Sequence, residues 1–487
     1  MHGHTFPEAV RFREGRAWGI NSRALAGSVT RRVDTIFCGT PAGSRTRLER
    51  VFCWANLRWA VLFTLVFFLA GCSLPQIDLP PALDRLLGRE EVAAVADDPM
   101  AATTSTLRLL APQSTTGENV LLLDLVNGYN RSFLQKPDAA DTLTVTVELA
   151  PRYTQALNNR LLDSPPPDVV AVDSFSFPAL AAAGKLAPIP SSVMAAQDLH
   201  PKLRAAFEVD GDLLCAQVEA STLALVYNKA VFDALDQPYP QADWTWDDLQ
   251  AAAKVLTVVD SSYYGLVINP DFSRWLPFLR QAGGSVFGPD GGVALETEPG
   301  SAALTYFVSL FQNGVAYTPV EFGAAWSGEA FATGRIAMTI EGNWLIPYLR
   351  SAAPEMSFGV ADLPAGPPPT GAEATVGFAN CYAIPADSLH PDEAAALIAY
   401  LTGSEAMNAW TDLRLTLPAR TGLQSDWLGR HPLMAPFLAG LDRATVWQFP
   451  TSFQTVLDNF QVDLQDVLSG SMLADVLLNR ADAFGKQ

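Results

Sequence analysis

The chain has 487 residues, of which 49% are hydrophobic and 17% are charged, so it is long enough for two or three compact domains and too apolar for a disordered or fibrous protein. Its 51 acidic and 32 basic residues give a net charge of −19, which argues against a nucleic-acid partner or an anionic membrane surface. The charge is uneven, because residues 1–71 hold ten arginines and only four acidic residues. Such asymmetry is typical of a targeting segment in front of a globular body.

The candidate targeting segment is the apolar run Trp59–Ala70, which follows basic residues. About a dozen residues are too few to span a bilayer, which needs roughly 20, but they fit the core of a signal peptide. The run leads into Leu69-Ala-Gly-Cys72, which resembles the bacterial lipobox, although a buried helix that ends in cysteine is the alternative. We therefore predict a lipoprotein signal peptide over 51–71, lipidation of Cys72, and a lipid-anchored protein on the extracytoplasmic face of the cell membrane. Residues 1–50 are expected to be a wrongly assigned or unstructured extension.

The mature chain begins with a Pro-, Asp- and Ala-rich stretch, 72–102, that is expected to be a tether. Beyond it, period-2 and helical apolar patterns alternate along the chain, which predicts βαβ units and an α/β fold with mostly parallel sheets. No second apolar run of about 18 residues follows, so the lipid is the only expected membrane contact. The expected strands are 107–110, 143–148, 168–172, 223–227 and 336–340, and the expected helices are 119–133, 153–162, 177–183, 246–256, 301–312, 328–333, 391–401, 404–413 and 451–483.

Catalytic and metal-binding motifs are missing from the sequence. There is no Gly-x-Ser-x-Gly elbow, no Walker loop, no His-Glu-x-x-His and no Cys-x-x-Cys. His200, His390 and His431 are not at metal-ligand spacing and each lies beside a proline. We therefore predict no enzymatic activity, no cofactor and no metal, while a pair of carboxylates acting as a surface glycosidase is left as the rival hypothesis.

Five motifs in sequence order resemble those of bacterial extracellular solute-binding proteins. They are Thr222–Lys229 with the following Val-Phe pair, Trp244–Leu249, Gly328–Trp344, Pro391–Leu401 and Leu417–Arg420. The resemblance implies a two-lobe periplasmic-binding-protein fold, in which each lobe is a mostly parallel sheet flanked by helices and hinge strands cross between the lobes. It also implies a receptor that hands a solute to the membrane subunits of an ABC importer, with sugar as the ligand of the maltose-binding branch.

On this resemblance we expect a first lobe of residues 103–217 and about 380–436. The second lobe is expected to hold residues 218–379 and about 437–487. The protein is expected to be a monomer that closes over a sugar or oligosaccharide. A phosphorylated polyol or another small polar solute is the alternative ligand, and it would require arginines and lysines in the cleft.

Trp344 is the leading site candidate, because it matches the family tryptophan that stacks on a sugar ring, although core packing is its alternative role. The neighbouring Asn343 is expected either to bond a ligand hydroxyl or to hold the end of a strand. The remaining candidates of the second lobe lie where a loop enters a helix, a position that faces the cleft in relatives. They are Asp271, Arg274 and Trp275, and a hydrophobic helix face explains Trp275 equally well.

In the first lobe, polar residues follow two expected strands and could contact a ligand or cap the helices that come next. Ser114, Thr115 and Glu118 follow the first strand, and Asp173 and Ser174 follow the strand 168–172. The crossing strands contribute four further candidates, Glu219, Ser221, Asn380 and Tyr382.

The family resemblance also places Cys215 and Cys381 on segments that run side by side between the lobes. They are the two cysteines that remain after Cys72, and an oxidising compartment permits a disulfide. Two buried free thiols are the alternative. Trp326, Trp410, Trp427 and Trp447 receive no role from the sequence.

Overall fold

The computed structural model describes residues 105–134, 143–194, 198–258, 260, 263–369 and 371–486. All of them belong to one compact unit, Asp98–Gln487. The expected extension, the signal peptide, Cys72 and the tether lie outside the described residues. Among the helices that are described, none is long and apolar enough to cross a membrane.

The first part of the sheet is built from β1 (Ser105–Pro112), β2 (Leu143–Ala150) and β3 (Val169–Asp173). β1 pairs in parallel with both neighbours, as expected for strands that are separated by helices. β3 then pairs antiparallel with β12 (Thr375–Pro385). The carboxyl ends of β1 and β3 therefore lie at the same edge, where α/β sheets commonly bind ligands.

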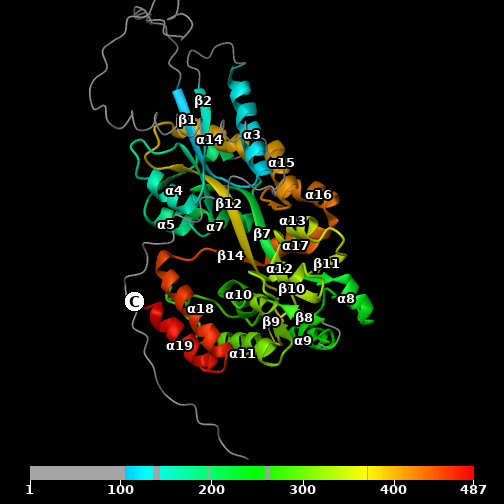
Figure 1. Cartoon of the computed structure of the whole chain (residues 1–487). Coiled ribbons are helices and arrows are strands. Elements are labelled where there is room, and N and C mark those ends of the chain that lie inside the picture. Colours follow the sequence, from blue (N-terminus) through cyan, green and yellow to red (C-terminus); the bar gives the residue numbers. More distant parts are fainter. Residues whose placement is uncertain are drawn as a thin grey trace, which may run out of the picture. The chain divides into compact units, whose positions relative to one another are not determined.

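Two long strands lie in the middle of the sheet and connect its two halves (Figure 1). The first half of β7 (Cys215–Asn228) pairs antiparallel with β12, and its second half pairs with β10 (Ile336–Gly342) and β11 (Phe358–Ala361). Nearly all of β7 is buried. A strand that is covered on both faces needs continuous apolar sequence, which the run Leu223–Tyr227 supplies.

The second half of the sheet continues from β10 to β8 (Tyr264–Val267) and β9 (Ala316–Tyr317) in parallel. Twelve strands of the described chain form one sheet, with the main order β2-β1-β3-β12-β7-β10-β8-β9. Pairing is parallel toward both ends and antiparallel at the crossing strands. The sheets are therefore mixed, within the α/β two-lobe fold that the sequence predicted.

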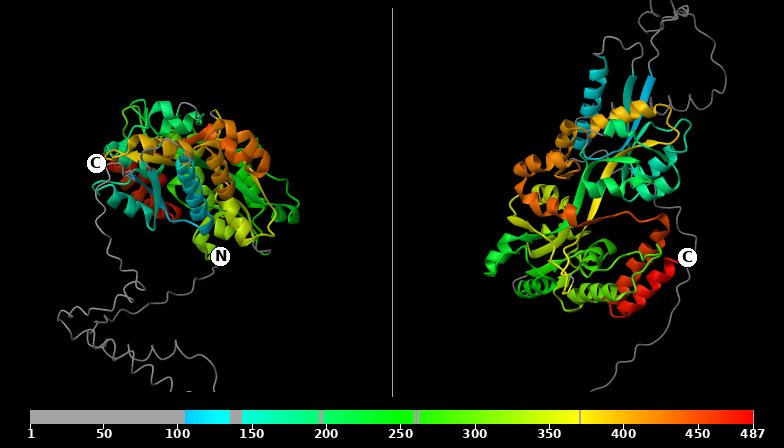
Figure 2. Two further views of the ribbon diagram at one scale, coloured as in Figure 1. Left: turned by 90° about the horizontal axis from the view of Figure 1, so that it is seen from above. Right: turned by 180° about the vertical axis from the view of Figure 1, so that it is seen from behind.

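Helices cover both halves of the sheet (Figure 2). The start of helix α9 (Trp246–Val255) is determined by the local sequence, because Thr245 and Asp248 form a capping box there. The other helices are α3 (Thr116–Leu134), α4 (Tyr153–Arg160), α5 (Phe177–Ala182), α6 (Ser191–Met194), α7 (Pro201–Ala206), α8 (Lys229–Ala234), α10 (Phe272–Gln281), α11 (Glu298–Gln312), α12 (Ser327–Phe331), α13 (Leu345–Ala352), α14 (Pro391–Leu401), α15 (Ser404–Arg414), α16 (Thr421–Arg430), α17 (Ala435–Arg443), α18 (Gln454–Leu468) and α19 (Ala474–Phe484). Short strands are β4 (Leu186–Ala187), β5 (Glu208–Val209), β6 (Asp212–Leu213), β13 (Leu417–Pro418) and β14 (Ala444–Val446), and the 3-10 turns are η2 (Pro319–Phe322), η3 (Pro432–Met434) and η4 (Thr451–Phe453).

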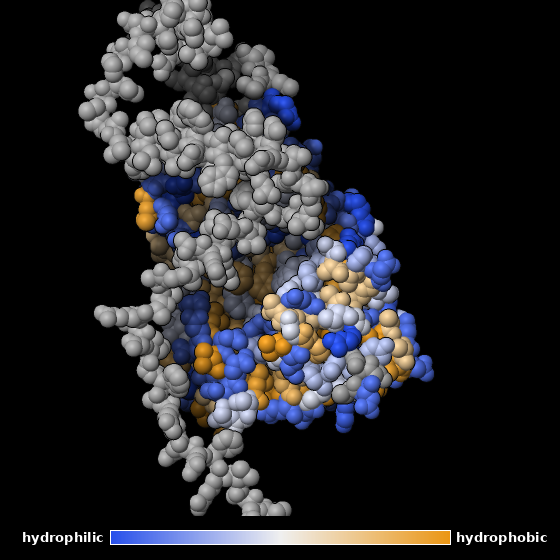
Figure 3. Space-filling view, viewed as in Figure 1, coloured by the Kyte–Doolittle hydropathy of each residue, from blue (hydrophilic) through white to orange (hydrophobic). Residues whose placement is uncertain are grey.

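Buried apolar side chains form two separate cores. The first core takes residues from β1, β3, α14 and α17, and the second from α9, α10, α11, α18 and α19. β7 contributes side chains to both cores. The predicted residue boundaries of the lobes stay a prediction. On the coloured part of the face in Figure 3, hydrophilic and apolar residues are interspersed.

One expected helix was wrong in its length. The segment 451–483 was expected to be a single helix, but it forms η4, α18 and α19. The break falls at Gly470, whose φ of 78° is a left-handed conformation that ends α18. The two helices then fold back on each other and contact α11.

Cys215 and Cys381 lie on the crossing strands β7 and β12, and a disulfide joins them in the structure. Their Cα atoms are 5.6 Å apart. The bond links the two strands on the side of the first core, where both cysteines are buried.

Candidate functional site

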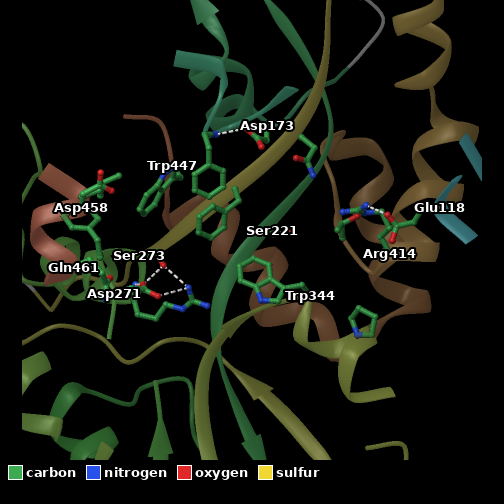
Figure 4. A pocket seen from close by; sticks show the side chains of 18 of the residues that line it. Glu118, Asp173, Ser221, Asp271, Ser273, Trp344, Arg414, Trp447, Asp458 and Gln461 are labelled. Carbon is green, nitrogen blue, oxygen red and sulfur yellow. Dashed lines mark hydrogen bonds and ion pairs between the residues drawn. The ribbon is translucent and has the colours of Figure 1, made fainter. Parts of the chain in front are cut away.

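A cavity of about 750 Å³ lies against the crossing strands, and Phe272 and Trp447 of the second core are among its lining residues (Figure 4). We name it the main cavity. Its walls come from the ends of β3 and α3, from β7 and β12, from the start of α10, and from α15 and α18. The lining residues are Glu118, Asp173, Phe175, Ser221, Asp271, Phe272, Ser273, Arg274, Trp344, Pro347, Phe378, Asn380, Leu413, Arg414, Thr416, Trp447, Leu457, Asp458 and Gln461.

Four aromatic rings form a cluster in the main cavity. Phe175 stacks on Phe378 with their centroids 5.6 Å apart, and Trp447 lies 5.4 Å from Phe175 and 6.0 Å from Phe378. Trp344 meets Phe378 edge to face at 5.6 Å. Phe175 is 55% exposed although it is a large apolar side chain. Exposed rings that line a cavity are suited to an apolar ligand face, such as the C–H face of a sugar.

Arg274 is neutralised by two acidic residues at the floor of the main cavity. It forms an ion pair with Glu341 at 2.7 Å and a longer one with Asp271 at 3.4 Å. Burial opposes the charge of Arg274, but Asp271 and Glu341 outweigh it and raise its pKa. Burial raises the pKa of Glu341, while Arg274 and the indole N–H of Trp344 partly offset this effect.

The same Asp271 begins α10. Its Oδ1 accepts hydrogen bonds from the backbone N–H of Arg274 and from the hydroxyl of Ser273. Asp271 is therefore an N-cap as well as a partner of Arg274. Its position in the cavity is fixed by the protein before any ligand enters.

A second arginine, Arg414, is also paired with two acidic residues. It forms ion pairs with Glu118 and, through Nε at 3.1 Å, with the buried Glu219. Glu219 accepts further hydrogen bonds of 2.6 Å from Asn380 and from Thr416. This network fixes α3, α15 and both crossing strands around one point.

A smaller cavity of about 310 Å³, which we name the inner cavity, adjoins the main cavity and shares Glu118, Asp173, Asn380 and Arg414 with it. The phenol of Tyr153 in its wall donates to the carbonyl oxygen of Ala171 at 2.6 Å. The remaining lining residues are Ala111, Pro112, Ser114, Asn119, Leu122, Thr154, Ala171, Val172, Val218, Glu219, Cys381, Tyr382 and Trp410. Burial raises the pKa of Tyr153 and of Tyr382, so both phenols stay neutral.

The structure brings most of the predicted site residues to these two cavities. Trp344, Asp271, Arg274, Glu118, Asp173, Ser221 and Asn380 line the main cavity, and Ser114, Glu219 and Tyr382 line the inner cavity. Ser174 is fully buried beside the main cavity, where its hydroxyl accepts from the backbone N–H of Ala379. Thr115 accepts from the backbone N–H of Glu118, which is a helix-capping contact.

Two predicted residues take other positions. Trp275 is fully buried in the second core, with its ring against Phe272 and Phe460. Asn343 is fully buried, and it accepts from the backbone N–H of Thr222 at 3.2 Å and donates to the carbonyl of Leu415 at 2.9 Å. We therefore take Trp275 as a core residue. Asn343 links the crossing strand β7 to the backbone at Leu415.

Sequence reasoning missed several cavity residues. Phe175, Phe378, Trp447 and Arg414 line the main cavity, and Asp458 and Gln461 reach it from α18. Phe175 directly follows the predicted Asp173 and Ser174, so its place after the end of a strand was a signal in the sequence. The residues of α18 carried no such signal. Of the other unassigned tryptophans, Trp410 lines the inner cavity, Trp427 is fully buried, and Trp326 packs edge to face on Tyr348.

Relatives are found by sequence. A Brucella abortus (strain 2308) protein described as a binding protein is 24% identical over 281 residues, which is 56% of this chain and 67% of the relative. An uncharacterized ABC transporter extracellular-binding protein of Pyrococcus horikoshii is 24% identical over 255 residues, which is 50% of this chain and 55% of that protein.

Solved structures share the fold. An ABC substrate-binding protein from Listeria monocytogenes, in complex with cycloalternan, matches with a TM-score of 0.67 at 21% identity and covers 79% of this chain and 98% of its own. A cyclic α-maltosyl-1,6-maltose binding protein from Arthrobacter globiformis matches with a TM-score of 0.66 at 23% identity, over 79% and 98% of the two chains. These likenesses show the two-lobe fold of periplasmic binding proteins.

The family comparison covers the region that holds most of the site. The model of the bacterial extracellular solute-binding proteins matches residues 136–436, which is more than half of the chain. The predicted family resemblance is thereby confirmed, together with the expectation of a binding protein rather than an enzyme. The chain belongs to the bacterial extracellular solute-binding protein family.

Proposed function

We propose that this chain is the receptor of an ABC importer and captures a sugar or an oligosaccharide in the main cavity. The observation that carries the proposal is the aromatic cluster of Phe175, Phe378, Trp447 and Trp344, surrounded by carboxylate, amide and hydroxyl groups. A pyranose has an apolar C–H face and polar hydroxyls, so it needs both kinds of surface. The Listeria protein in complex with cycloalternan, the Arthrobacter protein that binds cyclic α-maltosyl-1,6-maltose, and the Pyrococcus relative, an ABC transporter extracellular-binding protein, support this choice.

The phosphorylated polyol is the weaker alternative. A phosphate would need free guanidinium or ammonium groups, and the lining of the main cavity offers Arg274 and Arg414 as its cations. Each of them already forms ion pairs with two acidic residues. A phosphate would have to displace these carboxylates.

A thermal-shift screen against neutral sugars tests the proposed ligand class. A sugar present at 100 times its Kd stabilises the folded protein by about 2.7 kcal/mol. Isothermal titration then gives the affinity, and chromatography of the sugar after incubation with the protein shows whether it is recovered unchanged. Absence of a shift with mono- to tetrasaccharides, together with a shift for a polyol phosphate, would favour the alternative.

We further propose that Cys72 carries a lipid, which holds the receptor on the extracytoplasmic face of the membrane. This part rests on the sequence, because Cys72 lies outside the described residues. Cys72→Ser should abolish labelling by a radioactive fatty acid and leave the precursor uncleaved by the lipoprotein signal peptidase. Cys53→Ser is the matched control, since it removes a cysteine upstream of the motif. Equal labelling of wild type and Cys72→Ser would contradict the anchor.

A further inference from the structure

The charge balance of the main cavity points to one class of sugar. Among the described residues, its lining holds four carboxylates, Glu118, Asp173, Asp271 and Asp458, against two guanidinium groups, and neither a lysine nor a histidine. The carboxylates of Glu219 and Glu341 also bond these arginines from behind the lining. Both arginines are thus neutralised, and the cavity as a whole is negative.

Two of the four carboxylates have no cationic partner among the described residues. Asp173 accepts through Oδ1 from the backbone N–H groups of Phe175 and Ser176. Asp458 is exposed and accepts through Oδ1 from the side chain of Gln454 at 2.8 Å. For each of them the other carboxylate oxygen is left to accept from a ligand.

Most hydrogen-bond donors of the cavity are already used within the protein. The hydroxyl of Ser273 donates to Asp271, the amide of Gln461 donates to the carbonyl of Pro270, and the amide of Asn380 donates to Glu219. The hydroxyl of Thr416 and the indole of Trp344 also donate to buried glutamates. The cavity therefore offers a ligand many acceptors and few donors.

A ligand ammonium group fits such a surface. It has three donors and no acceptor, and its charge is attracted both by carboxylates and by the faces of aromatic rings. In Figure 4, Asp458 and Trp447 are drawn at one side of the view and the Glu118–Arg414 pair at the other, with Asp173 between them. Asp173 lies two residues before Phe175, whose ring contacts Trp447, so carboxylates without a cationic partner and aromatic rings line the same cavity.

We propose that the main cavity selects sugars or oligosaccharides that carry a protonated amine and rejects sugar acids. This inference rests on the proposed sugar-binding function and assigns the charge of its ligand. Asp458 is the specificity-determining residue that can be tested most cleanly, because it is exposed on α18 and its removal disturbs no ion pair among the described residues.

The test compares matched ligands on two backbones. Maltotetraose and cellotetraose are each used as the parent, as the 6-amino-6-deoxy derivative and as the 6-carboxy derivative, so that one position carries a hydroxyl, an ammonium or a carboxylate. Titration calorimetry in low salt should show about tenfold tighter binding of the amine than of the parent, and about tenfold weaker binding of the carboxylate. The preference for the amine should shrink in 0.5 M NaCl, because salt screens exposed charges.

The variant Asp458→Asn should lower the ratio of the affinity for the amine to the affinity for the parent sugar about threefold or more. Asp426→Asn, which removes an exposed carboxylate of α16 outside the cavity, is the charge-matched control and should change neither. If parent and amine bind within twofold of each other, or the carboxylate binds best, the inference is overturned while sugar binding stands. If none of the six compounds binds, the proposed sugar-binding function fails as well.

Discussion

Trp344 carries two roles at the scale of a single residue. Its ring lines the main cavity and meets Phe378, while its indole N–H donates to Glu341 at 3.0 Å. The side chain is half-buried rather than enclosed in the core. A ring that is oriented by a buried carboxylate and still reaches the cavity is preorganised to contact a ligand.

We expect Trp344→Ala to weaken sugar binding by about 1–3 kcal/mol, because it removes apolar burial and contact with a ring face. Titration calorimetry measures the loss, and circular dichroism checks that the fold is retained. Trp326→Ala is the matched control, since Trp326 is half-buried against Tyr348 and lines neither cavity. Unchanged affinity together with a large fall in melting temperature would make Trp344 a core residue only.

Glu341 should make stability depend on pH. Burial raises its pKa in the folded protein, although Arg274 limits the rise. In the unfolded chain the same carboxyl ionises near the ordinary value for glutamate, about 4.3. As the pH rises from there to the folded pKa, the unfolded state loses its proton first, so this group lowers the free energy of unfolding.

We therefore expect urea denaturation between pH 4 and pH 8 to show that the stability of Glu341→Gln, relative to wild type, improves as the pH rises. Glu341→Gln also weakens the pair with Arg274, which lowers the free energy of unfolding by an amount that we expect to be the same at each pH. This loss does not change how the difference in stability from wild type varies with pH. Glu355→Gln replaces an exposed carboxylate and should run parallel to wild type. A parallel curve for Glu341→Gln would show that its carboxyl titrates alike in both states.

At the scale of elements, apolar periodicity predicted most of the fold. The helix expected at 391–401 is α14 with the same bounds, and the strand expected at 336–340 is contained in β10. Periodicity failed at 451–483, because a single left-handed glycine, Gly470, divides a pattern that is otherwise continuous. Local conformational preference there outweighs the apolar pattern.

The candidate site was predicted less completely than the fold. Polar residues at strand ends, such as Asp173, could be found because strand ends converge in an α/β sheet. Residues such as Asp458 and Trp447 reach the cavity from segments distant in sequence, and no local pattern marks that contact. The roles of Asn343 and Trp275 depend on their burial, which a motif does not reveal.

The disulfide between β7 and β12 should stabilise the described unit. It links residues 166 positions apart, for which loop entropy gives about 5 kcal/mol as an upper figure. We expect mass spectrometry of non-reduced peptides to recover Cys215 joined to Cys381. In the presence of urea, the double variant Cys215→Ala/Cys381→Ala should have a lower melting temperature than wild type. Reduction should lower the stability of wild type and leave the double variant unchanged. Two free, alkylated cysteines in protein from an oxidising compartment would contradict the bond.

At the scale of the whole described unit, a ligand in the main cavity would touch residues from both halves. Asp173 ends β3 and Phe175 follows it in the first half, whereas Asp271 and Arg274 lie at the start of α10 beside the second core. The crossing strands β7 and β12 connect these halves. A ligand shifts the two halves toward a closed arrangement only if it makes contacts in that arrangement that it does not make in the open one.

We therefore expect small-angle X-ray scattering of residues 73–487, which lack the predicted signal peptide and lipid, to show a smaller radius of gyration when the protein is saturated with maltotetraose or cellotetraose, whichever gives the larger thermal shift. Trp344→Ala should reach the same radius of gyration when it is measured at a sugar concentration that saturates it. This substitution lowers the affinity for the sugar but leaves the crossing strands unchanged.

Asn343→Ala should behave differently, since it removes the hydrogen bonds to Thr222 and Leu415 beside the crossing strands without touching the ligand. We expect it to lower stability by about 1–3 kcal/mol and to change the radius of the sugar-free protein. An identical radius with and without bound sugar in wild type would mean that the ligand enters a cavity whose walls do not move.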